Sequence, residues 1–137
     1  MYPAELTAPM TRDLTEVGFG SLHTPADVEV AMSNKEGTFL LIVNSVCGCA
    51  AANARPGVKI ALREGTRPDR LYTVFAGVDR AATDRAREYL LPYPPSSPSI
   101  ALFKNGRLVH FLERHHIEGR SAQMIAENLK AAFAEYC

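Results

Sequence analysis

The sequence lacks any excess of charge of one sign. It has 15 lysine and arginine residues against 15 aspartate and glutamate residues, which gives a formal net charge of zero at pH 7 with neutral histidines. Proteins that bind nucleic acid or anionic membranes through charge need a surplus of basic residues. The composition therefore predicts neither nucleic acid nor a membrane surface as a partner.

Long hydrophobic runs are also missing. No stretch approaches the ~20 apolar residues of a membrane-spanning helix, and the opening MYPAELTAPMTRDL has no basic head followed by an apolar segment. We therefore expect no membrane span and no signal peptide, and a cytoplasmic location. The length of 137 residues and the hydrophobic content of 47% predict a single globular domain over residues 1–137.

Cysteine is scarce, with Cys47, Cys49 and Cys137 the three in the chain. A permanent disulfide is not expected in a reducing compartment, and an odd number leaves one thiol over if two pair. Cys47 and Cys49 are separated only by Gly48, where a hydrophobic run meets an alanine-rich one. Three interpretations are open: redox chemistry, metal binding, or inert cysteines in a buried segment.

Strand and helix patterns alternate along the chain and predict an α/β domain with a mixed sheet. The apolar runs 38–46 and 70–78 are typical of strands covered on both faces. Asn105-Gly106 predicts a hairpin between the last two strands. Helices are predicted over 3–18, with Leu6, Met10 and Leu14 on one apolar stripe, from a Thr24 cap, from about Cys49, from about Asp79 and from a Ser121 cap.

The switch from strand to helix falls at the cysteine pair. Residues two apart on a regular helix point to nearly opposite sides, at about 100° per residue. The two thiols therefore meet only if Cys47 precedes the first turn and Cys49 lies just inside it, with Gly48 allowing the bend. Because a helix start favours negative charge, we expect a lowered pKa for the thiol there and more thiolate at neutral pH.

Two kinds of chemistry suit such a pair. In redox chemistry, one thiolate attacks a disulfide and the second displaces what the first has captured, and a tight ring favours an easily reduced pair. In metal binding, the two thiolates join Cys137 or one of His110, His115 and His116 to hold zinc, copper or an iron–sulfur cluster. The spacing disfavours zinc, because structural sites usually place about two to four residues between paired ligands.

Several segments, taken with the pair, resemble one family. The block VNSVCGCAAANARPG, followed by VFAGVDRAAT, PPSSPSIALF, RHHIEGR and the terminal Cys137, is similar to the bacilliredoxins, which are small thioredoxin-fold proteins with a Cys-Gly-Cys site. The resemblance covers almost the whole chain. It implies an α/β, thioredoxin-like fold with a mixed central sheet flanked by helices and an N-terminal helical extension.

The resemblance also implies an enzyme, a thiol–disulfide oxidoreductase that removes bacillithiol or a similar small thiol from mixed disulfides on cytosolic proteins. Disulfide isomerase activity is a further expectation. Cys47 is then the attacking cysteine and Cys49 the resolving one. The expected partners are S-thiolated client proteins and the small thiol, with no metal or prosthetic group, and the chain is expected as a monomer or weak homodimer. Two alternatives remain: a non-enzymatic metal or iron–sulfur carrier that uses Cys47, Cys49 and a third ligand, and a redox-sensing binding module.

The same resemblance assigns residues around the pair. Pro98 is expected as the cis proline that thioredoxin-like folds place opposite the cysteines, with Ser97 offering backbone groups to an extended substrate. Glu118 or His115, in the loop after the last strand, is a candidate proton relay or contact for the small thiol. Gly119 is expected to serve the conformation of that loop.

Three further expectations concern the surroundings of the pair. The strand before Cys47 reads FLLIV and lacks the buried acid found in thioredoxin, so activation is expected to rest on the helix start. Arg55, about one turn after Cys49, is expected on the helix surface. Cys137 is a candidate third redox thiol. The proline-rich linker 90–95 is expected to affect access to the site.

Overall fold

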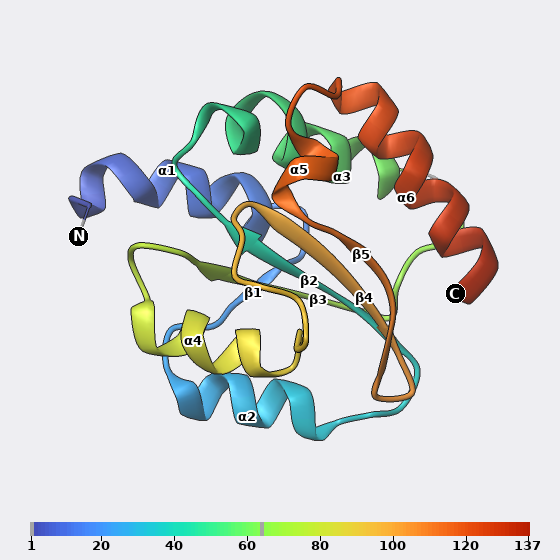
Figure 1. Cartoon of the computed structure of the whole chain (residues 1–137), viewed down its shortest axis with the longest axis horizontal. Helices are drawn as coiled ribbons and strands as arrows, with labels where there is room; N and C mark the ends of the chain where they lie inside the picture. The colour runs from blue at the N-terminus through green and yellow to red at the C-terminus, as the bar shows by residue number, and fades with distance from the viewer. Residues whose placement is uncertain (1, 64) are drawn as a thin grey trace.

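A mixed sheet of five strands organises the described part of the chain, which is residues 2–63 and 65–137 of a computed structural model (Figure 1). The strand order is β1-β3-β2-β4-β5. β1 and β2 run parallel to β3, whereas β4 is antiparallel to both β2 and β5. In chain order the elements are α1 (Ala4–Thr15), β1 (Gly20–Ser21), α2 (Pro25–Ser33), β2 (Thr38–Asn44), the π-helical segment η1 (Ala50–Ala54), α3 (Arg55–Ala61), β3 (Arg70–Phe75), α4 (Arg80–Glu88), β4 (Ser99–Lys104), β5 (Arg107–Leu112), α5 (Arg114–Ile117) and α6 (Ala122–Tyr136).

β2 lies in the middle of the sheet, and all seven of its residues are buried. Side chains of a strand alternate between its faces. Leu40 and Ile42 accordingly enter one hydrophobic cluster, and Leu41 and Val43 enter the other. The prediction of a central strand covered on both faces is confirmed, and it explains the continuous apolar run.

Helices cover both faces of the sheet (Figure 1): α2 and α4 lie on one side, and α1, α3, α5 and α6 on the other. α3 packs closely against α6 at Gly57, where an added Cβ would stand 2.7 Å from Ile125 Cγ2 and 3.0 Å from the Ala122 carbonyl oxygen. The two helices therefore meet with almost no side chain between them. Within the described ranges, no helix has the length and apolar character needed to cross a membrane.

The N-terminal helix forms as predicted, but its buried face differs from the expected stripe. α1 begins at Ala4 and continues through Pro9. Leu14 is fully buried, whereas Leu6 is 47% exposed and Thr7 is buried instead. The prediction is wrong at Leu6, because the buried side of α1 runs through Thr7 and Leu14 and leaves Leu6 facing outward.

Local turn and cap signals are confirmed. Asn105 and Gly106 have φ angles of 50° and 82°, the left-handed pair that a two-residue hairpin turn requires. The side chains of Thr24 and Ser121 each accept the backbone N–H three residues further on, as N-caps do. β1 and α5 were not predicted, because neither is long enough to show a period.

Candidate active site

Cys47 and Cys49 lie just past the carboxyl end of β2, at the start of the helix formed by η1 and α3. The backbone is helical from Gly48 onward, and the Cys47 carbonyl accepts the first helical N–H, that of Ala51, at 3.2 Å. Cys47 is therefore the N-cap residue and Cys49 lies in the first turn, as predicted. The two are joined as a disulfide with their Cα atoms 5.5 Å apart.

The pair is open on one side and packed on the other. Both cysteines are half-buried, and Gly48 between them is exposed. Of the cysteines in the described ranges, Cys49 alone packs against the hydrophobic cluster that contains Val58 and Ile117. Leaving aside its neighbours Cys47 and Cys49 and the backbone of its own helix, an added Cβ at Gly48 would meet no described atom within 4 Å, and the Gly48 φ angle is not positive. Gly48 thus faces open space and is not needed for a bend, which corrects our expectation.

Arg55 is buried beneath this turn, with 5% of its surface exposed, so the prediction of a surface arginine is wrong. Its Nη1 donates to Asn44 Oδ1 at 2.9 Å and to the Ser45 carbonyl at 3.0 Å. Its Nε donates to Asp13 Oδ2 at 3.3 Å. Burial lowers the pKa of the Arg55 guanidinium from its ordinary value, and the Asp13 carboxylate opposes that shift.

The polar contacts continue from Arg55 to Cys47. Asn44 Oδ1 also accepts the Ser45 N–H at 2.8 Å, and Ser45 Oγ accepts the Cys47 N–H at 3.1 Å. Asn44 Nδ2 donates to the Met10 carbonyl of α1 at 3.2 Å. These bonds satisfy the buried polar groups behind the pair and tie the turn to the N-terminal helix.

Ser97 and Pro98 lie beside the same end of β2. The Ser97–Pro98 peptide bond is cis, as expected. The register pairs Ser99 with Val43, so Pro98 is next to the residue at which β2 ends. The Arg114 guanidinium donates from Nη1 to the Ser97 carbonyl at 3.2 Å. A second cis bond, at Pro92 in the proline-rich linker, was not predicted.

The loop that contains Glu118 and Gly119 is tied to the helix that carries the pair. Asn53 Nδ2, in η1, donates to the Ile117 carbonyl at 3.3 Å. Glu118 Oε2 accepts from Arg114 Nε at 2.9 Å, so this carboxylate supports the arginine that contacts the Ser97 carbonyl. Gly119 has a φ of 78°, in the left-handed region that favours glycine.

Cys137 lies at the opposite end of the sheet from the pair. Its thiol is next to Thr38, the first residue of β2, with Asp69 and Lys104 nearby, and seven residues of strand span roughly 20 Å. Cys137 is exposed, yet desolvation raises the pKa of its thiol; Asp69 adds to that shift, whereas Thr38 and Lys104 oppose it. The structure therefore does not bring Cys137 together with Cys47, either as a redox partner or as a shared metal ligand.

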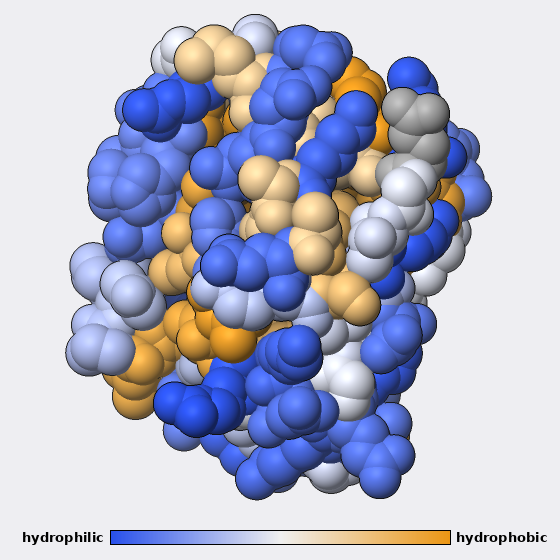
Figure 2. All heavy atoms as spheres, turned by 90° about the vertical axis from the view of Figure 1, so that its right-hand side faces the viewer, coloured by the Kyte–Doolittle hydropathy of each residue, from blue (hydrophilic) through white to orange (hydrophobic). Residues whose placement is uncertain are grey.

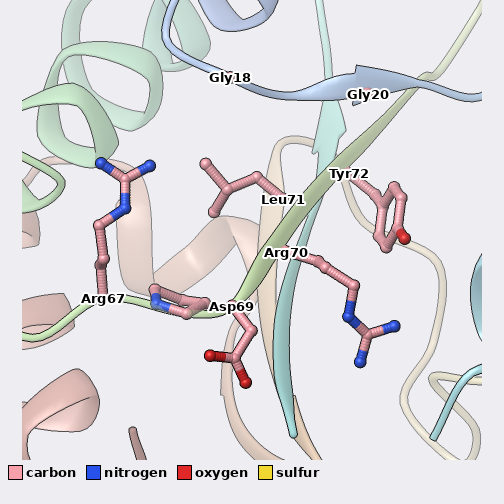
Figure 3. A pocket seen from close by; sticks show the side chains of 8 residues that line it. Gly18, Gly20, Arg67, Asp69, Arg70, Leu71 and Tyr72 are labelled. Carbon is pink, nitrogen blue, oxygen red and sulfur yellow. The ribbon is translucent and has the colours of Figure 1, made fainter. Parts of the chain in front are cut away.

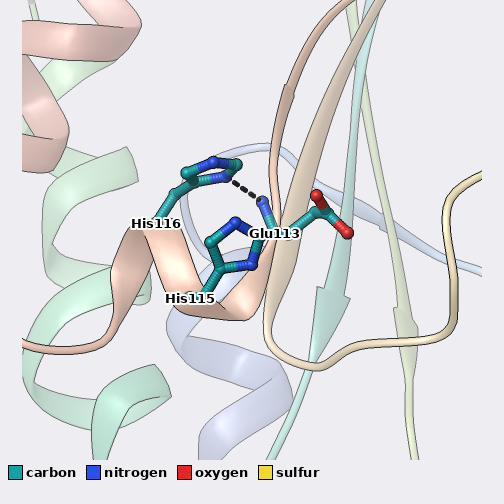
Figure 4. A group of neighbouring side chains, drawn as sticks. All are labelled: Glu113, His115 and His116. Carbon is teal, nitrogen blue, oxygen red and sulfur yellow. Dashed lines mark hydrogen bonds between the residues drawn. The ribbon is translucent and has the colours of Figure 1, made fainter.

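Glu113, His115 and His116 form a cluster around α5, with one donor atom of each within 4.8 Å of the others (Figure 4). His116 Nδ1 accepts the Glu113 backbone N–H at 3.0 Å, which places the proton of the neutral ring on Nε2. Metal-binding imidazoles show the reverse pattern, with one nitrogen free for the metal and the other donating. Burial lowers the pKa of His116. His116 therefore acts as a cap for α5.

A hollow of about 380 Å³ opens at the edge of the sheet (Figure 3). Gly18 lines it on one side and Arg67, Asp69 and Tyr72 on the other. It exists because β1 pairs with only two residues of β3. The register places the start of β3 beside the start of β2, so this hollow lies at the end of the sheet away from the cysteine pair.

Solved structures with a similar fold include thioredoxins. A thioredoxin pre-protein from Schistosoma mansoni superposes with a TM-score of 0.58 at 14% identity, covering 88% of this chain and 99% of its own. Oxidised thioredoxin O2 from Arabidopsis thaliana gives a TM-score of 0.58 at 14% identity, covering 86% and 96%. The chain therefore has a thioredoxin-like fold, with a cysteine pair at the start of the helix after its central strand.

Sequence relatives identify the family. The family model described as disulphide isomerase matches residues 2–137. A bacilliredoxin from Cytophaga hutchinsonii is 59% identical over 135 residues, covering 98% of this chain and 99% of its own. One from Halalkalibacterium halodurans is 50% identical over 136 residues, covering 99% and 94%. The chain belongs to this family, and its resemblance to the bacilliredoxins is confirmed.

Sequence reasoning missed Arg114 and misplaced Arg55. The partners of Arg55 come from α1 and from the end of β2, so no local pattern announces its burial. The signal for Arg55 in the sequence was the Ala-Arg-Pro tail of the cysteine block, which places this arginine a short way along the chain from the pair. Arg114 directly precedes His115 and His116 in the sequence, and no local pattern distinguishes it from a surface arginine.

Proposed function

We propose that this protein removes bacillithiol, or a similar small thiol, from mixed disulfides on client proteins in the cytosol. One observation carries the proposal: Cys47 occupies the N-cap of a helix next to the exposed Gly48, while Cys49 packs against the core. We assign Cys47 to meet the client and Cys49, on the core side, to meet Cys47. This asymmetry suits an attacking and a resolving cysteine.

The proposed cycle has two exchanges. The Cys47 thiolate attacks the small-thiol sulfur of a client mixed disulfide, and the client leaves as a thiolate that takes a proton from water. The Cys49 thiolate then attacks the Cys47 sulfur, releases the small thiol and closes the Cys47–Cys49 disulfide. The client cysteine is reduced by two electrons and the pair is oxidised by two. Two further small thiols return the pair to its reduced form.

The cis-Pro98 turn supplies the second side of the proposed site. Pro98 lies beside the end of β2, and the Ser97 carbonyl next to it is held by Arg114. We place an extended client segment along Ser97, with its mixed disulfide over Gly48. Glu118 contributes by holding Arg114.

The test is a trapping experiment with Cys49→Ala. A client that carries one S-bacillithiolated cysteine is mixed with the reduced variant, and intact-mass spectrometry follows both proteins. We expect the client to lose the small thiol and the variant to gain it at Cys47. Clients modified with glutathione, coenzyme A or cysteine identify which small thiol is preferred. Adding Cys137→Ala to the Cys49→Ala variant is the matched control, and it should leave the small-thiol adduct on Cys47 unchanged. An adduct mainly on Cys137 would contradict the assignment.

A second activity, disulfide isomerisation, is favoured by the description of the matching family model. Isomerisation needs an attack by Cys47 and release by a thiol of the client itself, so Cys49 is dispensable. We expect Cys49→Ala to reactivate a scrambled disulfide protein and Cys47→Ala to fail. If both variants are equally active, the isomerase proposal is wrong.

The metal-carrier alternative finds less support. The described residues around the pair would have to supply a third ligand, but Cys137 lies at the other end of β2 and His116 has its proton on the wrong nitrogen. Protein purified without oxygen should contain zinc, copper or iron well below one atom per chain. Stoichiometric metal would support the carrier. A sensing module would bind clients without turnover, which the trapping experiment distinguishes.

A further inference from the structure

We propose that Arg55 is a positioning residue for the attacking cysteine. It holds the backbone turn from Asn44 to Cys47 in the shape that presents Cys47 at the start of the helix. The inference depends on the thiol–disulfide chemistry of the pair, but not on which small thiol the protein handles.

The contacts of Arg55 converge on that turn. A single nitrogen, Nη1, bonds both Asn44 Oδ1 and the Ser45 carbonyl. Asn44 Oδ1 in turn accepts the Ser45 N–H, so the Ser45 peptide is held at its N–H and at its carbonyl. Ser45 Oγ then accepts the Cys47 N–H. Asn44, Ser45 and Cys47 are thus each held by at least one hydrogen bond.

Burying the charged guanidinium of Arg55 costs free energy that its contacts must offset. A charged group taken out of water needs a partner and complete hydrogen bonding. Asp13 supplies the partner from α1, and it also accepts from Lys59 Nζ at 2.7 Å. Because Asp13 offsets the charge of Arg55, we assign the guanidinium a geometric role toward Cys47. The planar fork of arginine can serve Asp13 and the turn at once, which a lysine ammonium cannot do.

The experiment measures single-thiol kinetics in a Cys49→Ala, Cys137→Ala parent, so that Cys47 is the one thiol. The rate constant for its reaction with 4,4′-dithiodipyridine is followed by absorbance, well below the melting temperature of each variant. We expect Arg55→Lys to lower this rate constant about tenfold, since small errors in placement are costly for reaction rates. Asp13→Asn is the matched control. It removes the charge partner but leaves the Nη1 bonds, and it should retain the parent rate within about twofold.

A double-mutant cycle tests whether Arg55 acts through Ser45. Ser45→Ala deletes the hydroxyl that accepts the Cys47 N–H, and it should also lower the rate constant. Once that bond is gone, adding Arg55→Lys should cost much less than it does alone. A residue that only stabilises the fold would lower the melting temperature and leave the rate constant of folded protein unchanged.

The inference is overturned if the rate constant of Arg55→Lys stays within about twofold of the parent value, or if Asp13→Asn lowers it as much as Arg55→Lys does. It is also overturned if the double variant loses the full product of the fold-changes seen in Arg55→Lys and Ser45→Ala. If Arg55→Lys does not fold, Ser45→Ala is the deciding variant, because it removes only one hydroxyl. A rate constant equal to that of the parent then counts against the proposal. An unreactive Cys47 in the parent would instead contradict the proposed function.

Discussion

The two ends of β2 place a cysteine in opposite surroundings. At the carboxyl end, Cys47 caps a helix, has open space beside it at Gly48, and is backed by the buried polar contacts of Arg55. At the amino end, Cys137 is exposed and lies next to Thr38 and Asp69, and desolvation raises the pKa of its thiol. The amino acid is the same, so the difference shows that the contacts around a sulfur, and not its presence, determine whether it is suited to exchange.

α6 connects the two ends. Its first turns pack on α3 at Gly57, in the helical segment that follows the pair, and its last residue leads into Cys137. Figure 2 shows the side of the molecule where α6 ends, and hydrophilic residues separate the hydrophobic ones on that surface. The four predictions below test the contrast between the ends, from the largest effect to the smallest.

Removing each thiol in turn tests most directly whether the cysteines at the two ends of β2 differ in function. Cys47→Ala should lower the rate of small-thiol removal from a client at least about 1000-fold, because the nucleophile is lost. Cys137→Ala should leave it within about twofold of the parent. Initial rates measured by the release of client thiol check both. Comparable losses would show that the two ends act together.

Two glycines sharpen the contrast between the packed and the open side of the pair. Gly57→Ala should lower the free energy of unfolding by about 1–3 kcal/mol, because the new methyl group meets Ile125 and the Ala122 carbonyl. Gly48→Ala is the matched control and should change it by less than about 0.5 kcal/mol. Urea unfolding of the two reduced variants gives both values. Equal effects would mean that the pair is not open where we place it.

The pH dependence of alkylation compares the two thiols directly. The thiolate is the reactive form, and burial raises the pKa of Cys137 by disfavouring that charged form. Its reaction with iodoacetamide should therefore rise with pH and reach half its maximum above the pH at which an ordinary cysteine thiol does. In Cys49→Ala, Cys47 should reach half its maximum below about 8.5, since the helix start favours thiolate, and should react about tenfold faster at pH 7. Peptide mass spectrometry separates the sites, and profiles in the reverse order would remove the electrostatic argument.

The smallest effect is expected at the edge of the site. Glu118→Gln removes the ion pair with Arg114, whose side chains are both exposed, and exposed pairs contribute little. Client turnover at low client concentration should fall by less than about threefold, and the change should appear as a higher KM. Arg114→Gln also removes the bond to the Ser97 carbonyl and should cost more. If Glu118→Gln abolished turnover, the carboxylate would have to act on the reacting atoms.

The sequence predicted what depends on neighbours along the chain. The hairpin at Asn105-Gly106, the caps at Thr24 and Ser121 and the strand-to-helix switch at Cys47 all follow from local backbone preferences and periodicity. The cis bond at Pro98 came from the resemblance and not from any local pattern. Roles assigned to Ser97, Glu118 and Gly119 remain predictions.

What could not be predicted depends on contacts between distant segments. Arg55 meets Asp13 across 42 positions of sequence, and nothing near Arg55 distinguishes it from a surface arginine. Cys137 could not be placed, because the direction of α6 relative to β2 decides which end of the sheet it reaches. Leu6 followed the helical period, yet α1 turns Thr7 inward in its place, and which side of a helix is buried depends on how the helix packs.

The close seating of α3 on α6 at Gly57 bears on which clients can be served. A helix held that firmly from behind cannot tilt or slide to fit a rigid surface. The client has to bring its modified cysteine to the enzyme, so we expect efficient repair at cysteines on protruding loops, chain termini or unfolded segments, and slow repair at cysteines set into flat, folded surfaces.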